Sequence, residues 1–155
     1  MNFSDSFDKL IGHEGGYTPG KGDPGGETKF GISKRAYPGE DIPHLTLERA
    51  RALYLRDYWG PAGCDAVPDG LRFQLFDMAV NSGVGRAIKT LQQAAGAAAD
   101  GILGPVTLQA LQRVPAPRLV ARFNGHRLAF MASLPTWPTF SRGWALRIAD
   151  NLLDA

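Results

Sequence analysis

Cysteine and long apolar runs are nearly absent from this 155-residue chain, and their absence excludes several classes of protein. Cys64 is the only cysteine, so no intrachain disulfide can form and a disulfide-stapled secreted scaffold is excluded. No apolar run approaches the length that crosses a bilayer, so we expect no membrane span. The first residues also lack the basic and apolar segments of a signal peptide. We therefore expect cytoplasmic synthesis, with a separate factor delivering the protein to any substrate outside the cytoplasm.

The chain also has little surplus charge and few metal-binding side chains. Its formal net charge is +2, and no run of lysine and arginine could follow a phosphate backbone, so we expect no nucleic-acid partner. His13, His44, His126 and Cys64 are not spaced like the ligands of a zinc site. A zinc amidase or endopeptidase is therefore disfavoured, and we expect neither a metal nor an organic cofactor.

The spacing of apolar residues predicts a mainly helical protein with one small β element. A helix is predicted over residues 3–11, and the glycines around Glu14 must end it. Residues 17–32 are rich in glycine and predict a small hairpin or irregular sheet. From Thr46, a good N-cap, the pattern predicts about six helices. The predicted helix ends are residues 59–61, Gly83 and Gly96, and the last two helices are predicted over 117–134 and 140–153.

Two carboxyl groups near the β element could cleave a glycosidic bond. This reaction usually needs one carboxyl group as acid and a second as base or nucleophile. Glu14 follows an amphipathic helix, and its flanking glycines would give an extended sugar close access to the backbone. Asp23, nine residues later, opens a tight turn that could bring it across from Glu14, and the Thr28 hydroxyl could position a water. Aspartate is also a common turn residue, so Glu27 stays open as the second carboxylate.

Two motifs in this region resemble the opening of glycoside hydrolase family 108, whose members are N-acetylmuramidases of phage endolysins and related bacterial proteins. They are residues 13–17 (His-Glu-Gly-Gly-Tyr) and 23–32 (Asp-Pro-Gly-Gly-Glu-Thr-Lys-Phe-Gly-Ile). The likeness continues through residues 58–59, 76–83, 100–107, Arg127 and 140–144. The stretch at 100–107 resembles the predicted peptidoglycan-binding region that usually follows in the family.

The resemblance implies a fold, a division of the chain and a reaction. The fold would be α+β and lysozyme-like, a helical bundle with a small glycine-rich β-hairpin near the N-terminus. Residues 1–92 would form the catalytic region, and residues 93–155 a helical peptidoglycan-binding region packed on it. The protein would be a muramidase that hydrolyses the MurNAc-β-1,4-GlcNAc bond of peptidoglycan glycan strands. As an endolysin it would be a monomer that a holin releases to the periplasmic cell wall.

Roles for single residues follow from the same resemblance. Glu14 corresponds to the general acid, while Asp23 and Thr28 correspond to the pair that holds the water in phage-type lysozymes. The gap from Asp23 to Thr28 is one residue shorter than in those lysozymes. Further acidic residues that family members often carry are missing from residues 18–22, so Asp23 is the only aspartate available in this loop.

Several other side chains are candidates for contact with the sugar. Tyr17, Tyr58 and Trp59 could stack on sugar faces, although core packing would explain aromatic residues at these positions almost as well. Asn81 could donate a hydrogen bond to an acetamido or hydroxyl group, and the alternative is a buried amide bonded to the backbone. Glu27 completes the predicted substrate-binding set of Tyr17, Glu27, Tyr58 and Asn81.

Three further side chains are given structural roles. Asp77 is expected to be a solvated or capping carboxylate. Trp137 and Trp144, near the end of the chain, are expected in the core.

Two other functions stay open at the level of sequence. A lytic transglycosylase would use Glu14 without a water-activating base and would leave an anhydro sugar. A non-catalytic peptidoglycan-binding module would keep the fold after its active site had decayed. The intact set of Glu14, Asp23 and Thr28 argues against the second of these.

Overall fold

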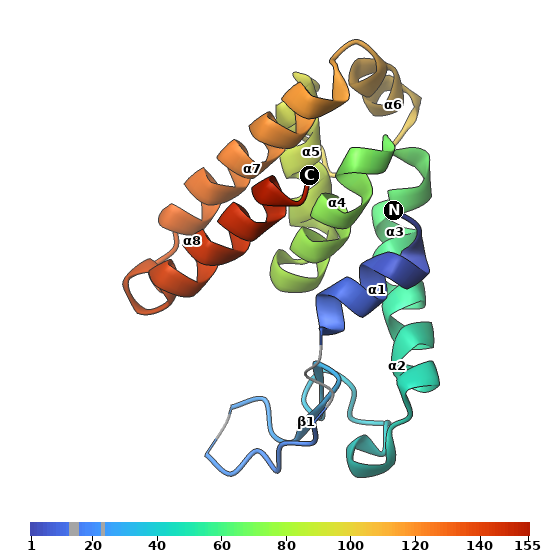
Figure 1. Cartoon of the computed structure of the whole chain (residues 1–155), viewed down its shortest axis with the longest axis vertical. Helices are drawn as coiled ribbons and strands as arrows, with labels where there is room; N and C mark the ends of the chain where they lie inside the picture. Colours follow the sequence, from blue (N-terminus) through green and yellow to red (C-terminus); the bar gives the residue numbers. More distant parts are fainter. Residues whose placement is uncertain (13–15, 23) are drawn as a thin grey trace. The chain divides into compact units, whose positions relative to one another are not determined.

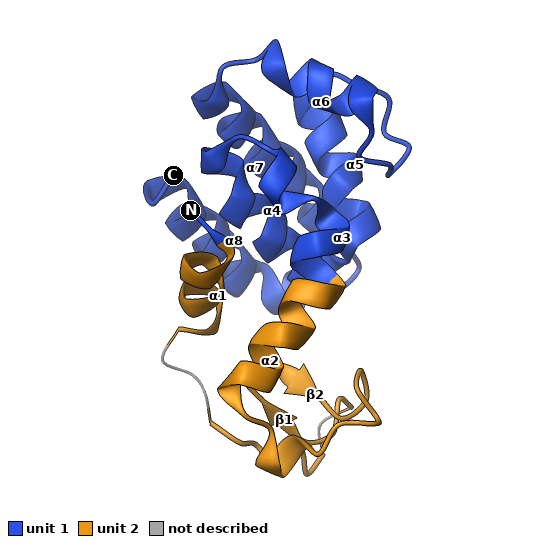
Figure 2. Ribbon diagram, turned by 90° about the vertical axis from the view of Figure 1, so that its right-hand side faces the viewer, with its two compact units in different colours: residues 1–2, 58–155 blue, residues 3–57 orange. Residues whose placement is uncertain are grey.

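The computed structural model describes residues 1–12, 16–22 and 24–155. They form two compact units, which we name the N-terminal unit (residues 3–57) and the helical unit (residues 1–2 and 58–155; Figure 2). In the described part of the chain, no helix is both long and apolar enough to span a membrane. The predicted boundary between a catalytic region and a peptidoglycan-binding region, at residue 92, falls inside the helix Val84–Ala95. This division by function stays a prediction.

The helices of the N-terminal unit form where the sequence predicted them. α1 (Phe3–Ile11) buries Phe7 completely, and the Phe7 ring meets that of Tyr54 edge-on with 5.5 Å between centroids. α2 (Leu47–Tyr54) begins at the predicted cap, where Thr46 Oγ1 accepts a backbone N–H of the first turn at 3.1 Å. A 3-10 turn, η1, precedes α2 in the chain.

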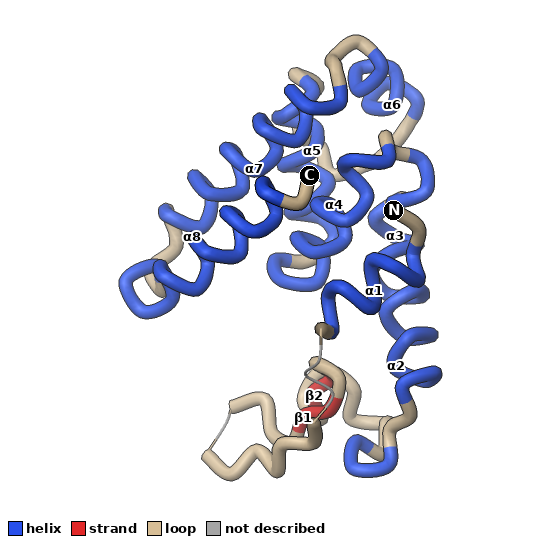
Figure 3. The backbone as a smooth tube through the Cα atoms, viewed as in Figure 1, coloured by secondary structure: helices blue, strands red, loops and turns tan. Residues whose placement is uncertain are grey.

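The β-hairpin of this unit is short and turns at two residues with positive φ. β1 (Thr28–Lys29) pairs antiparallel with β2 (Ile32–Ser33), and Figure 3 draws both strands in red. Phe30 (φ 50°) and Gly31 (φ 73°) connect them, as in the type I′ turns that match the twist of paired strands. The Tyr54 hydroxyl donates to the Phe30 carbonyl at 3.1 Å, and a side chain on Gly31 would collide with that hydroxyl.

The sequence predicted that the helical segment beginning with α2 ends at residues 59–61, and this prediction is wrong. The chain continues through the π-helical turn η2 (Leu55–Trp59) and the short helix α3 (Gly60–Ala62), and the helical course ends at Gly63. Pro61 is tolerated because it lies in the first turn of α3, where a missing N–H costs no helical hydrogen bond. Gly63 has φ 67°, the left-handed conformation that commonly ends helices.

α4 (Asp69–Ser82) is the central helix of the helical unit. It packs against α5 (Val84–Ala95) and α7 (Ala116–Ala132), and α7 packs in turn against α8 (Trp137–Leu153) (Figure 1). Its middle residues are buried around the whole helix, as expected for a helix enclosed by others. The shorter α6 (Pro105–Gln112) contacts α5.

The helix boundaries of this unit confirm most of the predicted signals. Gly83 (φ 88°) ends α4 and Gly96 (φ 74°) ends α5, as predicted. α8 begins at Trp137 rather than at Phe140, because Pro138 fits the first turn of a helix instead of breaking it. The fold is mainly α-helical with one small antiparallel sheet, which confirms the predicted lysozyme-like class.

Candidate active site

Glu14 and Asp23, the predicted acid and second carboxylate, lie outside the described residues, as does His13. α1 ends at Ile11, and the N–H of Gly12 bonds back to the last turn of the helix at 3.0 Å. Gly12 has φ 58°, a left-handed conformation that stops the helix. Glu14 therefore follows the end of α1 in the chain, as the sequence predicted.

The segments that carry the two halves of the predicted motif are paired with each other. Thr18 and Thr28 exchange two backbone hydrogen bonds, of 2.8 and 2.9 Å, as an antiparallel bridge. In the loop between them, the backbone of Gly26 lies so close to Gly20 that no side chain would fit on Gly20. Thr28 also pairs with Ser33 of β2. The residue that follows the first motif is therefore paired with a strand of the second motif.

Two predicted substrate-binding residues are bonded to each other in the N-terminal unit. The Tyr17 hydroxyl donates to Glu27 Oε2 at 2.7 Å, and this hydrogen bond raises the pKa of Tyr17. Tyr17 is 42% exposed, so its ring remains accessible to a ligand. The structure therefore brings Tyr17 and Glu27 together, and Thr28 is the next residue along the chain.

The other two predicted binding residues, Tyr58 and Asn81, belong to the helical unit. Tyr58 is half-buried in η2, and Asn81 is exposed near the end of α4. Asn81 Nδ2 donates to the main-chain carbonyl of Asp77 at 2.8 Å and lies 3.4 Å from Oδ1 of its carboxylate. The amide nitrogen that the sequence analysis offered to a sugar is therefore engaged within the protein.

Asp77 is not the solvated or capping carboxylate that the sequence predicted. Its side chain is 1% exposed and accepts hydrogen bonds from Arg127 (2.7 Å), Arg147 (2.5 Å) and Asn151 (2.9 Å). Burial raises the pKa of Asp77, but these partners outweigh burial and hold the pKa below its ordinary value. Sequence reasoning missed this cluster because the partners lie 50, 70 and 74 residues away along the chain. From the sequence, only the contact between Asp77 and Asn81 could be predicted, because these residues are one helical turn apart.

The aromatic candidates divide into a buried residue and an accessible group. Trp59 is buried in the core, with its ring edge-on to Phe76 at 5.4 Å, so it does not stack on a sugar. Trp137 and Trp144, predicted in the core, are half-buried instead. The Trp144 ring stacks on that of Phe140 with 5.5 Å between centroids, and Phe140 is 51% exposed. The prediction that Trp137 and Trp144 lie in the core is therefore wrong, and the first half of α8 carries accessible aromatic side chains.

The described residues offer neither a reactive thiol nor a cluster of metal ligands. Cys64, in the 3-10 turn η3 (Cys64–Ala66), is buried, and burial raises the pKa of its thiol to about 12. At neutral pH the side chain is thus a neutral thiol and a poor nucleophile. In the described ranges, no group of three histidine, cysteine, aspartate or glutamate side chains could hold a metal ion.

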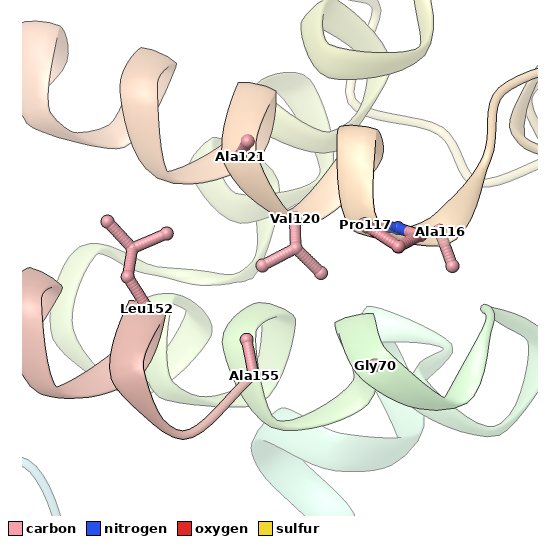
Figure 4. Close-up of a pocket in the computed structure, with 7 residues that line it drawn as sticks. All are labelled: Gly70, Ala116, Pro117, Val120, Ala121, Leu152 and Ala155. Atoms are coloured by element: carbon pink, nitrogen blue, oxygen red, sulfur yellow. The ribbon is translucent and has the colours of Figure 1, made fainter.

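The helical unit also contains an apolar hollow of about 310 Å³ between the start of α7 and the end of α8 (Figure 4). It is lined by Gly70, Ala116, Pro117, Val120, Ala121, Leu152 and Ala155. None of these side chains can transfer a proton, so this hollow supplies no acid or base for hydrolysis.

Comparisons with known proteins identify the family. The model of glycosyl hydrolase 108 matches residues 7–83, and the model of a peptidoglycan binding domain matches residues 73–111. The structure of SagA from Brucella abortus is similar to the chain with a TM-score of 0.87 and 32% sequence identity, covering 98% of this chain and 92% of SagA. The chain belongs to glycosyl hydrolase family 108. A search of curated proteins finds no match.

As a member of family 108, the chain is a glycoside hydrolase, and the second match associates it with peptidoglycan. Both predicted motifs, at residues 13–17 and 23–32, lie inside the region that matches the hydrolase model. The peptidoglycan-binding match includes residues 100–107, the stretch in which the sequence analysis noted that likeness.

Proposed function

We propose that the chain is an N-acetylmuramidase, a lysozyme-type enzyme that hydrolyses the MurNAc-β-1,4-GlcNAc bond of peptidoglycan with Glu14 as general acid. The observation that supports this most strongly is the pairing of Thr18 with Thr28. It pairs a residue that follows Glu14 with a residue that follows Asp23, within the region that matches the hydrolase model. A glycosidase needs two carboxyl groups beside the bond, and the motif supplies these two.

In the proposed reaction, Glu14 protonates the glycosidic oxygen while the bond from that oxygen to C1 of MurNAc breaks. Positive charge then develops on the sugar ring, and Asp23 stabilises that charge or activates the attacking water. The Thr28 hydroxyl is a second contact for this water. The water oxygen ends on C1 as the new hydroxyl group. The proton that the water gives up passes to Asp23 where Asp23 activates the water, or to the ionised Glu14 where Asp23 only stabilises the charge.

Tyr17, Glu27, Tyr58 and Asn81 are the proposed sugar contacts. The hydrogen bond from Tyr17 to Glu27 restrains the Tyr17 ring, so less side-chain freedom is lost when a sugar stacks on it. Because Glu27 already accepts this hydrogen bond, we prefer Asp23 as the second catalytic carboxylate and keep Glu27 as the alternative.

The test is the rate at which soluble fragments are released from purified peptidoglycan. Glu14→Gln keeps the shape of the side chain but cannot donate the proton, so the rate should fall by about 100-fold or more. Glu48→Gln is the matched control, because Glu48 is exposed in the first turn of α2 and has no proposed role. A Glu14→Gln protein as fast as the wild type would contradict the assignment. An inactive wild type that still binds peptidoglycan would favour a non-catalytic binding module.

We further propose that the enzyme is a monomeric, cofactor-free endolysin of the phage type that is made in the cytoplasm and reaches the wall through a holin. Cells that express the chain together with a holin should then lyse, and cells that express the chain alone should not. Equal lysis in both would overturn the holin step. Sedimentation equilibrium should give the 16.7 kDa mass of a single chain, and a multiple of it would overturn the monomer.

A further inference from the structure

A second hollow in the helical unit combines polar and aromatic lining groups. It has a volume of about 120 Å³ and lies where the last turn of α4, the end of α7 and the first half of α8 meet. Its lining residues are Asn81, Ser82, Phe130, Met131, Leu134 and Trp144. At roughly 30 Å³ per water molecule, this space holds about four waters, which suits a small substituent rather than a whole sugar ring.

The orientation of the Asn81 amide determines what this hollow can recognise. Nδ2 faces two acceptors, the main-chain carbonyl of Asp77 and its carboxylate, so the reverse orientation would place oxygen against oxygen. The carbonyl Oδ1 of Asn81 is therefore the atom left for a ligand, and in the described part of the chain no donor reaches it. The hollow offers a hydrogen-bond acceptor to an N–H or O–H group.

Buried charges hold the Asn81 amide in this orientation. Asp77 stays an ionised, acceptor-only carboxylate because Arg127 and Arg147 bond to it at 2.7 and 2.5 Å, with Asn151 at 2.9 Å. Its Oδ1 is shared between Arg147 and Asn81. Asp77 and its partners are thus positioning residues that act on the ligand only through Asn81.

Apart from Ser82, the remaining wall of the hollow is apolar. Phe130, Met131 and Leu134 lie at the end of α7, and the half-buried Trp144 faces them from α8. Trp144 stacks on the exposed Phe140, which extends the aromatic surface beyond the hollow. The hollow thus combines a hydrogen-bond acceptor, a small apolar space and an aromatic platform. These three features complement a secondary amide that carries a methyl group and is attached to a ring with an apolar face.

We propose that this hollow binds the acetamido group of a GlcNAc or MurNAc residue of the glycan strand. Asn81 Oδ1 accepts the amide N–H, the methyl group packs against Phe130, Met131 and Leu134, and the sugar ring rests on Trp144. The proposal depends on the proposed function only for the choice of peptidoglycan as the polymer. It replaces the donor role that the sequence analysis gave to Asn81 with an acceptor role.

Titration of the wild-type chain with chitotriose, followed by NMR at the indole N–H of Trp144, tests the proposal directly. Trp144→Phe identifies that signal. The matched ligand is the fully de-N-acetylated trisaccharide, which keeps the sugar rings and lacks the amide. We expect a saturable shift with chitotriose, and a dissociation constant at least about tenfold higher with the de-N-acetylated ligand. Equal binding of the two ligands, or binding that leaves the Trp144 signal unmoved, would overturn the proposal.

A second ligand, N-acetyl-L-alanine amide, tests whether the hollow recognises the sugar or the peptide stem of peptidoglycan. It presents a methylated secondary amide without a sugar ring. Tighter binding of this amide than of chitotriose would assign the hollow to the peptide instead.

Paired variants locate the contacts. Trp144→Ala should weaken chitotriose binding by about tenfold, while Leu146→Ala, which shortens an exposed apolar side chain of the same helix outside the hollow, should change it less than about twofold. Asn81→Ala removes the acceptor and should weaken binding by about threefold to tenfold. Equal effects of the Trp144 and Leu146 changes would contradict the proposal. None of these measurements uses Glu14, so binding at this hollow and failure of the muramidase assignment would remain distinguishable.

Discussion

Each unit contains an ion pair between an arginine and an aspartate, and the two pairs differ in burial. In the N-terminal unit, Arg51 and Asp8 meet at 2.7 Å with side chains that are 32% and 59% exposed. In the helical unit, Arg127 and Asp77 meet at the same distance with side chains that are 0% and 1% exposed. Water screens the first pair and is excluded from the second, so removing one partner has little effect in one unit and a large effect in the other.

This difference matches the tasks that we propose for the units. The N-terminal unit carries the motif on loops and short strands whose shape depends on backbone conformation, such as Phe30 with its positive φ. The helical unit instead holds a recognition group, the Asn81 amide, on a buried network of charges. Substitutions in the motif should therefore affect turnover, and substitutions in the network should affect stability first.

Removing a charge from each unit should give the largest contrast. Asp77→Ala leaves Arg127 buried without its carboxylate and should lower the free energy of unfolding by about 3–5 kcal/mol. Asp8→Ala breaks the exposed pair with Arg51 and should lower it by about 1 kcal/mol or less. Urea denaturation measures both, and similar losses for the two variants would refute the comparison.

Within the motif, the two candidate carboxylates should separate by rate. Asp23→Asn should slow peptidoglycan hydrolysis by about 100-fold or more, while Glu27→Gln should slow it by less than about tenfold. Glu27→Gln should not shift the urea midpoint appreciably, since Glu27 lies outside the helices and strands of the N-terminal unit. The reverse order of rates would make Glu27 the catalytic carboxylate.

Acid should weaken the Asp77 network in a defined range of pH. The pKa of Asp77 is held below its ordinary value, so its contribution to stability is complete above about pH 4 and is lost as the pH falls through the lower pKa of the folded state. The difference in unfolding free energy between the wild type and Asp77→Asn should therefore be constant from about pH 7 to pH 5 and shrink below about pH 4. A difference that stays constant down to about pH 2 would show that the charge of Asp77 is not what matters.

The smallest expected effect concerns the helix cap in the N-terminal unit. Thr46→Ala removes the side-chain oxygen that accepts the backbone N–H at 3.1 Å and should lower the free energy of unfolding by about 1 kcal/mol. Thr46→Ser keeps the oxygen and should retain most of the stability. Equal losses for both variants would mean that the methyl group, rather than the cap, matters.

Local chemistry in the sequence predicted the helices well. The cap at Thr46 and the glycine stops at Gly83 and Gly96 act within a few residues of their own helix, so one segment contains the whole cause. The predicted helix end at residues 59–61 is wrong, because Pro61 does not end the helical segment there. A π-helical turn before α3 places Pro61 in a first turn, and this wider turn has no simple sequence signal.

The candidate site was predicted less completely, for a physical reason. Pairing of Thr18 with Thr28 agrees with the predicted β element, because both residues flank one glycine-rich loop. The environment of Asp77 could not be predicted, since its partners Arg127 and Arg147 lie on helices that only the tertiary fold brings to it. The catalytic roles of Glu14 and Asp23 stay predictions.

The central claim, that the chain hydrolyses the bond at C1 of MurNAc, is tested most directly by digesting purified peptidoglycan in H₂¹⁸O and analysing the fragments by mass spectrometry. A muramidase should give reducing MurNAc ends that carry one ¹⁸O atom at C1, and Glu14→Gln should give almost none. Anhydro-MurNAc ends without the label would instead show a lytic transglycosylase, and labelled GlcNAc ends would show cleavage of the other glycosidic bond. Either result would contradict the account.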